Sequence, residues 1–119
     1  MSRSYSDVLL ETMLERSRLL RNWRQLARAV AKAVKELYPN ARVYLAGSVA
    51  RGEWIAASDI DIVVVLDHEP CMREAAQVIE HAWKKLDLPL NHPIEIHVIG
   101  PNSLEKYKKN TLLQPLEPE

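Results

Sequence analysis

The chain has 119 residues, of which 47% are hydrophobic and 27% charged, with equal numbers of basic and acidic side chains. This length suits a single compact domain with its own core and leaves no room for a second one. The single cysteine, Cys71, excludes an internal disulfide and a metal site built on cysteines, and it favours a reducing compartment.

Targeting signals and the distribution of charge narrow the class of protein further. The N-terminus lacks the apolar core of a signal peptide, and no apolar run approaches the roughly 20 residues of a membrane span. We therefore expect a cytoplasmic protein without membrane contact. Residues 1–42 hold nine Lys/Arg and four Asp/Glu, whereas the remainder holds seven and twelve. This uneven distribution of charge indicates either an acidic site that needs cations or simply two surfaces that are solvated differently.

The first predicted element is one long helix over residues 7–38. Apolar residues recur there at steps of three or four, and Pro39-Asn40 ends the pattern. Unbroken, the helix would be about 46 Å long, which exceeds the diameter of a small domain. It therefore either bends near Ser17 or projects and packs on something else. Its start is apolar, and its later half carries a basic face, for which a nucleic-acid surface is the minority interpretation.

The remaining elements predict an α/β (α+β) fold in one domain, residues 1–119. A central strand that is apolar on both faces would join two others in a small mixed three-strand sheet, with helices packed on one side. We take residues 42–99 as the catalytic core and residues 111–119 as a frayed tail. The expected elements are strands at 42–46, 60–66 and 94–99, a helical turn at 48–51, and helices at 70–86 and 103–110.

Two nearby segments carry the residues that phosphate chemistry needs. Gly47 and Ser48 follow a strand and open a helical turn, where backbone N–H groups can approach a phosphate. Asp59 and Asp61 are two residues apart, so on a strand they share a face. Adjacent carboxylates repel unless a cation lies between them, and Mg²⁺ takes one or two carboxylates plus substrate phosphates. Glu95, on the next strand, is the candidate third carboxylate, as metal ligand or as base.

Each of these carboxylates also has an ordinary structural interpretation. Asp59 and Asp61 alone would mark a turn and the start of a strand, but the upstream glycine–serine pair favours a function. For Glu95, an exposed strand carboxylate is an equally good interpretation. The four histidines are interpreted as structural or solvated, and His97 is the one that shares a face with Glu95.

Arg51 is a further candidate because it lies one turn after Ser48. It can contact the triphosphate of a nucleotide, and it can equally pair with Glu53 or Asp67. Gly52, next to it, is expected to be needed for the geometry of the turn.

The string from Gly47 to Glu53, followed by Ser58-Asp59-Ile60-Asp61-Ile62, resembles the signature of the DNA polymerase β-like nucleotidyltransferases. It is most similar to their smallest members, the minimal nucleotidyltransferases of archaea and bacteria. The resemblance covers residues 41–99 and implies the nucleotidyltransferase fold. It implies that the glycine–serine turn holds the triphosphate and that Asp59 and Asp61 bind two Mg²⁺ or Mn²⁺ ions. In this family a third carboxylate on a later strand shares one metal, and Glu95 is the strand candidate here.

The resemblance also implies an activity and a partner. The activity is transfer of a nucleoside monophosphate, AMP from ATP, to an acceptor hydroxyl with release of pyrophosphate. Such proteins are often encoded beside a HEPN-domain protein and act as antitoxins, some by modifying a tyrosine of the toxin with AMP. We therefore expect a HEPN-type partner, or self-association through the N-terminal helix. Two alternatives stay open: an antitoxin that works by contact with weak or no catalysis, and a catalytic subunit that needs a separate substrate-binding subunit.

Overall fold

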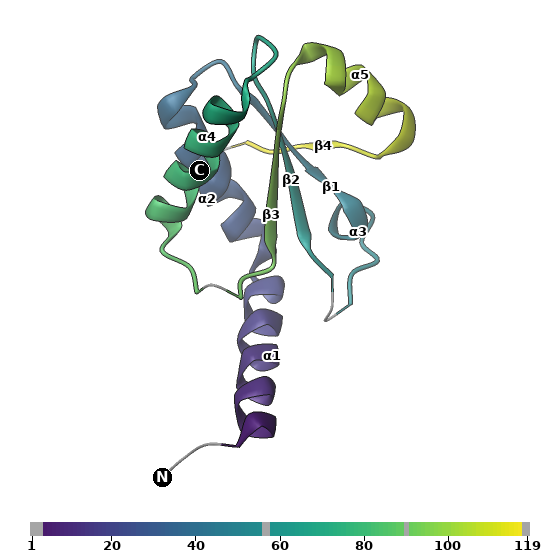
Figure 1. The fold of residues 1–119 in the computed structure, drawn as a ribbon. Coiled ribbons are helices and arrows are strands. Elements are labelled where there is room, and N and C mark those ends of the chain that lie inside the picture. The colour runs from purple at the N-terminus through teal and green to yellow at the C-terminus, as the bar shows by residue number, and fades with distance from the viewer. Residues whose placement is uncertain (1–3, 56–57, 90, 118–119) are drawn as a thin grey trace.

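The computed structural model describes residues 4–55, 58–89 and 91–117. Its elements are α1 (Tyr5–Arg21), α2 (Trp23–Leu37), β1 (Arg42–Ala46), α3 (Gly47–Ala50), β2 (Ile60–Val65), α4 (Met72–Leu86), β3 (Ile94–Ile99), α5 (Pro101–Asn110) and β4 (Gln114–Pro115). The strands form one mixed four-strand sheet in the order β3-β2-β1-β4 (Figure 1). Strands β2 and β3 are parallel, and β1 is antiparallel to both of its neighbours.

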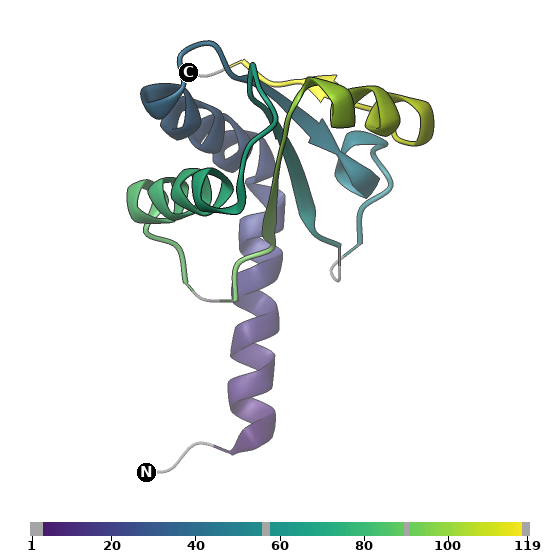
Figure 2. The same ribbon diagram turned by 45° about the horizontal axis from the view of Figure 1, so that its top comes forward.

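Helices lie on both faces of the sheet, which corrects the expectation of helices on one side. On one face α2 and α4 pack together and against the sheet (Figure 2). On the other face α5 places Leu104 against Val63 and Val65. Because alternate residues of β2 point to opposite faces, β2 is buried on both, as its continuous apolar run predicts. The larger core, beneath α2 and α4, includes Val30, Val34, Leu45, Ile62, Val64, Val78 and Ala82.

The helix predicted over residues 7–38 is two helices in the structure. Asn22 separates α1 from α2 and has φ −96° and ψ 23°. Its N–H donates to the carbonyls of Leu19 and Leu20, which closes α1. The break therefore lies at residue 22 and not near Ser17. Figure 1 shows α2 running at an angle to α1, so that the buried face of α2 lies on the sheet while α1 leaves it.

Helix α1 projects away from the sheet in both views (Figures 1 and 2). The described chain measures 52 × 29 × 26 Å along its principal axes, and Leu20 is the one residue of α1 that is buried. Five large apolar side chains of α1 are between 46% and 58% exposed: Val8, Leu9, Leu10, Met13 and Leu14. The projecting helix thus carries an apolar surface, one of the two outcomes expected from its length. Among the described residues, no helix has both the length and the hydrophobicity to cross a membrane.

The C-terminal segment adds a strand to the three that were predicted. Strand β4 pairs with β1, and the Leu116 N–H donates to the carbonyl of Val43 at 2.8 Å. The expectation of a frayed tail over residues 111–119 is therefore wrong for residues 114–116. Without this segment β1 would be an edge strand with unpaired backbone groups, which the tail satisfies. Pro115, which has no N–H, is tolerated because β4 is itself the edge.

Candidate metal and nucleotide site

Gly47, where β1 ends and α3 begins, packs directly on the carboxylate of Asp61. Ala46 and Asp61 are register partners on the antiparallel strands β1 and β2, so the end of β1 meets the start of β2. Gly47 follows with φ +73°, the left-handed region that favours glycine. A Cβ at this position would overlap Oδ2 of Asp61. Glycine is therefore required here twice, by its backbone conformation and by the carboxylate beside it.

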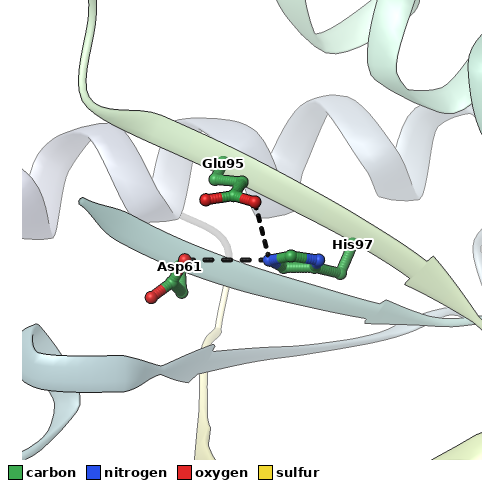
Figure 3. A group of neighbouring side chains, drawn as sticks. All are labelled: Asp61, Glu95 and His97. Atoms are coloured by element: carbon green, nitrogen blue, oxygen red, sulfur yellow. Dashed lines mark ion pairs between the residues drawn. The ribbon is translucent and has the colours of Figure 1, made fainter.

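Three side chains that can ligate a metal gather on the same face, where β2 and β3 run in parallel. Asp61 is the register partner of Glu95, and Val63 is that of His97. One ligand atom of each of Asp61, Glu95 and His97 lies within 4.8 Å of the others. Figure 3 shows the three side chains turned toward one another. His97 Nε2 is 3.7 Å from Asp61 Oδ1 and 3.6 Å from Glu95 Oε1.

Burial and neighbouring carboxylates both disfavour a negative charge on Asp61. Burial raises the pKa of the Asp61 carboxyl above its usual range, and the charges of Glu95 and Asp59 raise this pKa further, while His97 opposes them. Ionisation of Asp61 is therefore less favourable in the folded chain than in the unfolded one. A divalent ion would offset this cost, because it supplies positive charge to carboxylates that repel one another. The donor set, two carboxylates and an imidazole on one sheet face, fits such an ion.

We expect Asp61→Asn to raise the melting temperature of the metal-free protein near neutral pH. The folded pKa of Asp61 lies above its unfolded value, so the carboxylate destabilises the folded state at pH above both values. This cost declines as the pH falls from the folded pKa towards the unfolded one, because the folded chain takes up the proton first. Thermal melts of both proteins from neutral pH down to about pH 4 should show the difference narrowing. A wild-type protein that melts higher than the variant at neutral pH without metal would contradict this account.

Asp59 does not belong to the group of three. It precedes β2, and its Oδ1 accepts a hydrogen bond of 2.5 Å from Arg16 Nη2 of α1. The same guanidinium donates to the carbonyls of Ser58 and Asn91. Arg16 thus joins the base of α1 to the two loops that lead into β2 and β3. The carboxylate of Asp59 remains close enough to Asp61 to raise its pKa.

Ser48 lies in α3, next to Gly47, and Arg51 follows directly after this helix. Arg51 Nε is 3.3 Å from Glu53 Oε2, and both side chains are largely exposed. This pair is the structural alternative that the sequence offered for Arg51. Ser48 is partly buried, and its carbonyl accepts from the N–H of Glu53. Exposed ion pairs of this kind contribute little stability, so Arg51 is free to exchange Glu53 for an anion.

Two residues of this region, Arg16 and His97, were not among the site residues predicted from the sequence. Arg16 reaches Asp59 across 43 positions of sequence, and no local pattern signals a contact that depends on how α1 leaves the domain. His97 did carry a signal, since it lies two residues after Glu95 on a strand.

The nucleotidyltransferase domain family matches residues 27–116, from α2 to beyond β4. The chain belongs to this family. The fold agrees: "a putative nucleotidyltransferase from Sulfolobus solfataricus" superposes with a TM-score of 0.59 over 95% of this chain and 89% of that one, at 22% identity. No curated protein is significantly similar to the chain. The family and the fold implied by the Gly47-to-Ile62 motif are thereby confirmed, and with them the general activity of transferring nucleotidyl groups.

Proposed function

We propose that this nucleotidyltransferase transfers AMP from ATP to an acceptor hydroxyl and releases pyrophosphate. One observation carries the proposal: the glycine turn after β1 packs on Asp61, and Asp61 faces Glu95 across the β2–β3 pair. A phosphate held by the turn would therefore lie beside a site for a divalent ion. In the reaction the acceptor oxygen bonds to the α-phosphorus, the bond from that phosphorus to the β-phosphate oxygen breaks, and pyrophosphate leaves.

The acidic residues would hold the metal. Asp59, Asp61 and Glu95 are the proposed ligands of Mg²⁺ or Mn²⁺, two ions in all. Bound there, the ions would neutralise charge on the triphosphate and lower the pKa of the acceptor hydroxyl. Asp59 would have to leave Arg16, which would then be free to meet the incoming phosphates. Glu95, which is 55% exposed, would either complete this metal site or accept the hydroxyl proton.

The turn would hold the nucleotide. The absence of a side chain at Gly47 lets the backbone approach a phosphate, and the Ser48 hydroxyl can donate to it. Arg51 would pair with the β- or γ-phosphate once it leaves Glu53. These residues position the triphosphate for in-line attack, so catalysis consists of positioning and charge neutralisation.

Calorimetric titration tests the proposed ligand. We expect ATP to bind in the presence of Mg²⁺ or Mn²⁺ and much more weakly without either ion, because triphosphate and carboxylates repel one another. AMP is the matched control, since it carries the same base and sugar without the β- and γ-phosphates. Equal binding of ATP and AMP, with no effect of metal, would show that the turn and the acidic group do not form a triphosphate site.

A second candidate function is that of an antitoxin subunit that neutralises a HEPN-type partner by contact, with weak or no catalysis. The observation that favours it is the apolar surface of α1, because monomers rarely tolerate such a surface. Assembly through α1, with a partner or with a second copy, is compatible with either function. The five exposed apolar side chains lie on the part of α1 that projects beyond the contact between Arg16 and Asp59.

We expect Leu10→Glu combined with Leu14→Glu to dissociate the assembly. These side chains are 57% and 58% exposed in the single chain, so the substitutions should cost the isolated fold little while placing charges in any interface. Light scattering on both proteins, alone and with the partner recovered from the native source, measures the effect. A matched control is Arg18→Glu, an exposed change on the same helix that removes no apolar area. If wild type and double variant are both monomers and no partner is recovered, assembly through α1 is wrong.

A further inference from the structure

His97 occupies a position that neither the motif nor the family match assigns. It lies two residues after Glu95 on β3, and its ring is directed at the two carboxylates of the site (Figure 3). Its Nε2 is 3.6 Å from Glu95 Oε1 and 3.7 Å from Asp61 Oδ1. Both distances exceed the 2.7–3.2 Å of an ordinary N–H···O hydrogen bond. The imidazole therefore stands close to both carboxylates without being hydrogen-bonded tightly to either.

These separations lie within the range that two ligands of a common ion can span. Two ligands about 2.1 Å from one ion lie about 3.0 Å apart when adjacent in an octahedron and at most about 4.2 Å apart when opposite. The two distances from Nε2 fall between those limits. The imidazole is also partly covered, since its ring centroid lies 6.5 Å from that of Tyr107 on α5 and the His97 side chain is 34% exposed.

We propose that His97 Nε2 is a third ligand of the ion shared by Asp61 and Glu95, and that it makes this site prefer a first-row transition ion such as Mn²⁺ over Mg²⁺. The inference rests on the proposed function, since it assumes a metal at these carboxylates. Mg²⁺ is a hard ion that takes oxygen ligands almost exclusively, whereas first-row transition ions also bind imidazole. Replacing one oxygen ligand by a nitrogen therefore lowers the affinity of the site for Mn²⁺ less than its affinity for Mg²⁺.

The experiment measures metal binding directly, without turnover. Metal-free protein is titrated with Mn²⁺ and with Mg²⁺ by calorimetry, and the Mn²⁺ complex is examined by electron spin-echo spectroscopy, which detects nitrogen bound to the ion. We expect wild type to show nitrogen coupling and to bind Mn²⁺ more tightly than Mg²⁺. In His97→Ala the coupling should vanish, and the ratio of the two affinities should fall by about tenfold or more. His97→Gln keeps side-chain bulk without an imidazole and should lose the coupling too.

His68→Ala is the matched control. His68 also contacts two carboxylates, those of Asp67 and Glu74, but it lies beyond the other end of β2. Its replacement should change neither the coupling nor the ratio. Nitrogen coupling that persists in both His97 variants, or an unchanged ratio of affinities, would overturn the role of His97. Mn²⁺ binding that also survives Asp61→Asn would overturn the metal site itself, and with it the proposed function. Asp61→Asn thus separates the two failures.

Discussion

Replacing Asp61 with asparagine should weaken metal-dependent ATP binding by about 3 kcal/mol, or roughly 100-fold. Asp61 is the residue on which the site converges, since Gly47 packs on its Oδ2, Glu95 is its neighbour on β3, and His97 lies 3.7 Å from its Oδ1. The amide keeps the shape of the side chain and removes the charge that holds a cation. Binding of ATP measured without metal should change far less, because the variant lacks only the metal contribution.

Asp59→Asn should act in the same direction, since Asp59 is the other proposed ligand in the motif. The matched control is Asp67→Asn, an exposed carboxylate just after the far end of β2. It changes the net charge by the same amount and should leave ATP binding intact. Unchanged metal-dependent binding in both Asp59→Asn and Asp61→Asn would remove the basis of the metal assignment.

The second large effect is expected at Gly47. Gly47→Ala introduces a Cβ that overlaps Oδ2 of Asp61 in a backbone with φ +73°. The left-handed conformation alone costs a residue with a side chain about 1–2 kcal/mol. Relieving the overlap must also displace the carboxylate or the turn, so we expect ATP binding in the presence of metal to fall by at least about tenfold. Calorimetry and a melting curve separate the loss of binding from the loss of stability.

Gly52→Ala provides a close control for this substitution. Gly52 has the same φ of +73°, but a Cβ there would meet nothing within 4 Å. Both variants therefore bear the same backbone strain, and only Gly47→Ala disturbs Asp61. If the two variants lost stability and ATP binding equally, the effect at Gly47 would come from its backbone conformation alone. The contact between Gly47 and the carboxylate of Asp61 would then not contribute to ATP binding.

Local patterns in the sequence predicted the centre of this molecule well. The spacing of two between Glu95 and His97, and the apolar run of β2, correctly placed these side chains on their faces, because side chains alternate along a strand. The glycine at residue 47 was likewise predicted from its local context, since it follows a strand and opens a helical turn. The family signature then supplied the fold, which periodicity alone left open between α/β and α+β.

The features that the sequence did not predict depend on contacts between distant segments. The end of α1 at Asn22 involves neither glycine nor proline, and β4 is a two-residue strand whose pairing depends on the free edge of β1. The contact of Arg16 with Asp59 depends on the direction in which α1 leaves the domain. Asp59 and Asp61 were expected to share one face of a strand. In the structure β2 begins at Ile60, so Asp59 lies before the strand and pairs with Arg16 instead.

Transfer of a nucleoside monophosphate can be distinguished from transfer of the terminal phosphate by labelling ATP at one phosphate or the other. The protein is incubated with Mg²⁺ or Mn²⁺ and an extract of its native source, in parallel with ATP labelled at the α-phosphate and at the γ-phosphate. We expect a macromolecular acceptor to gain the α-label and not the γ-label, with release of pyrophosphate and loss of labelling in Asp61→Asn. Labelling of the acceptor from the γ-phosphate, or α-labelling that is equal in wild type and Asp61→Asn, would contradict transfer of a nucleoside monophosphate at this site.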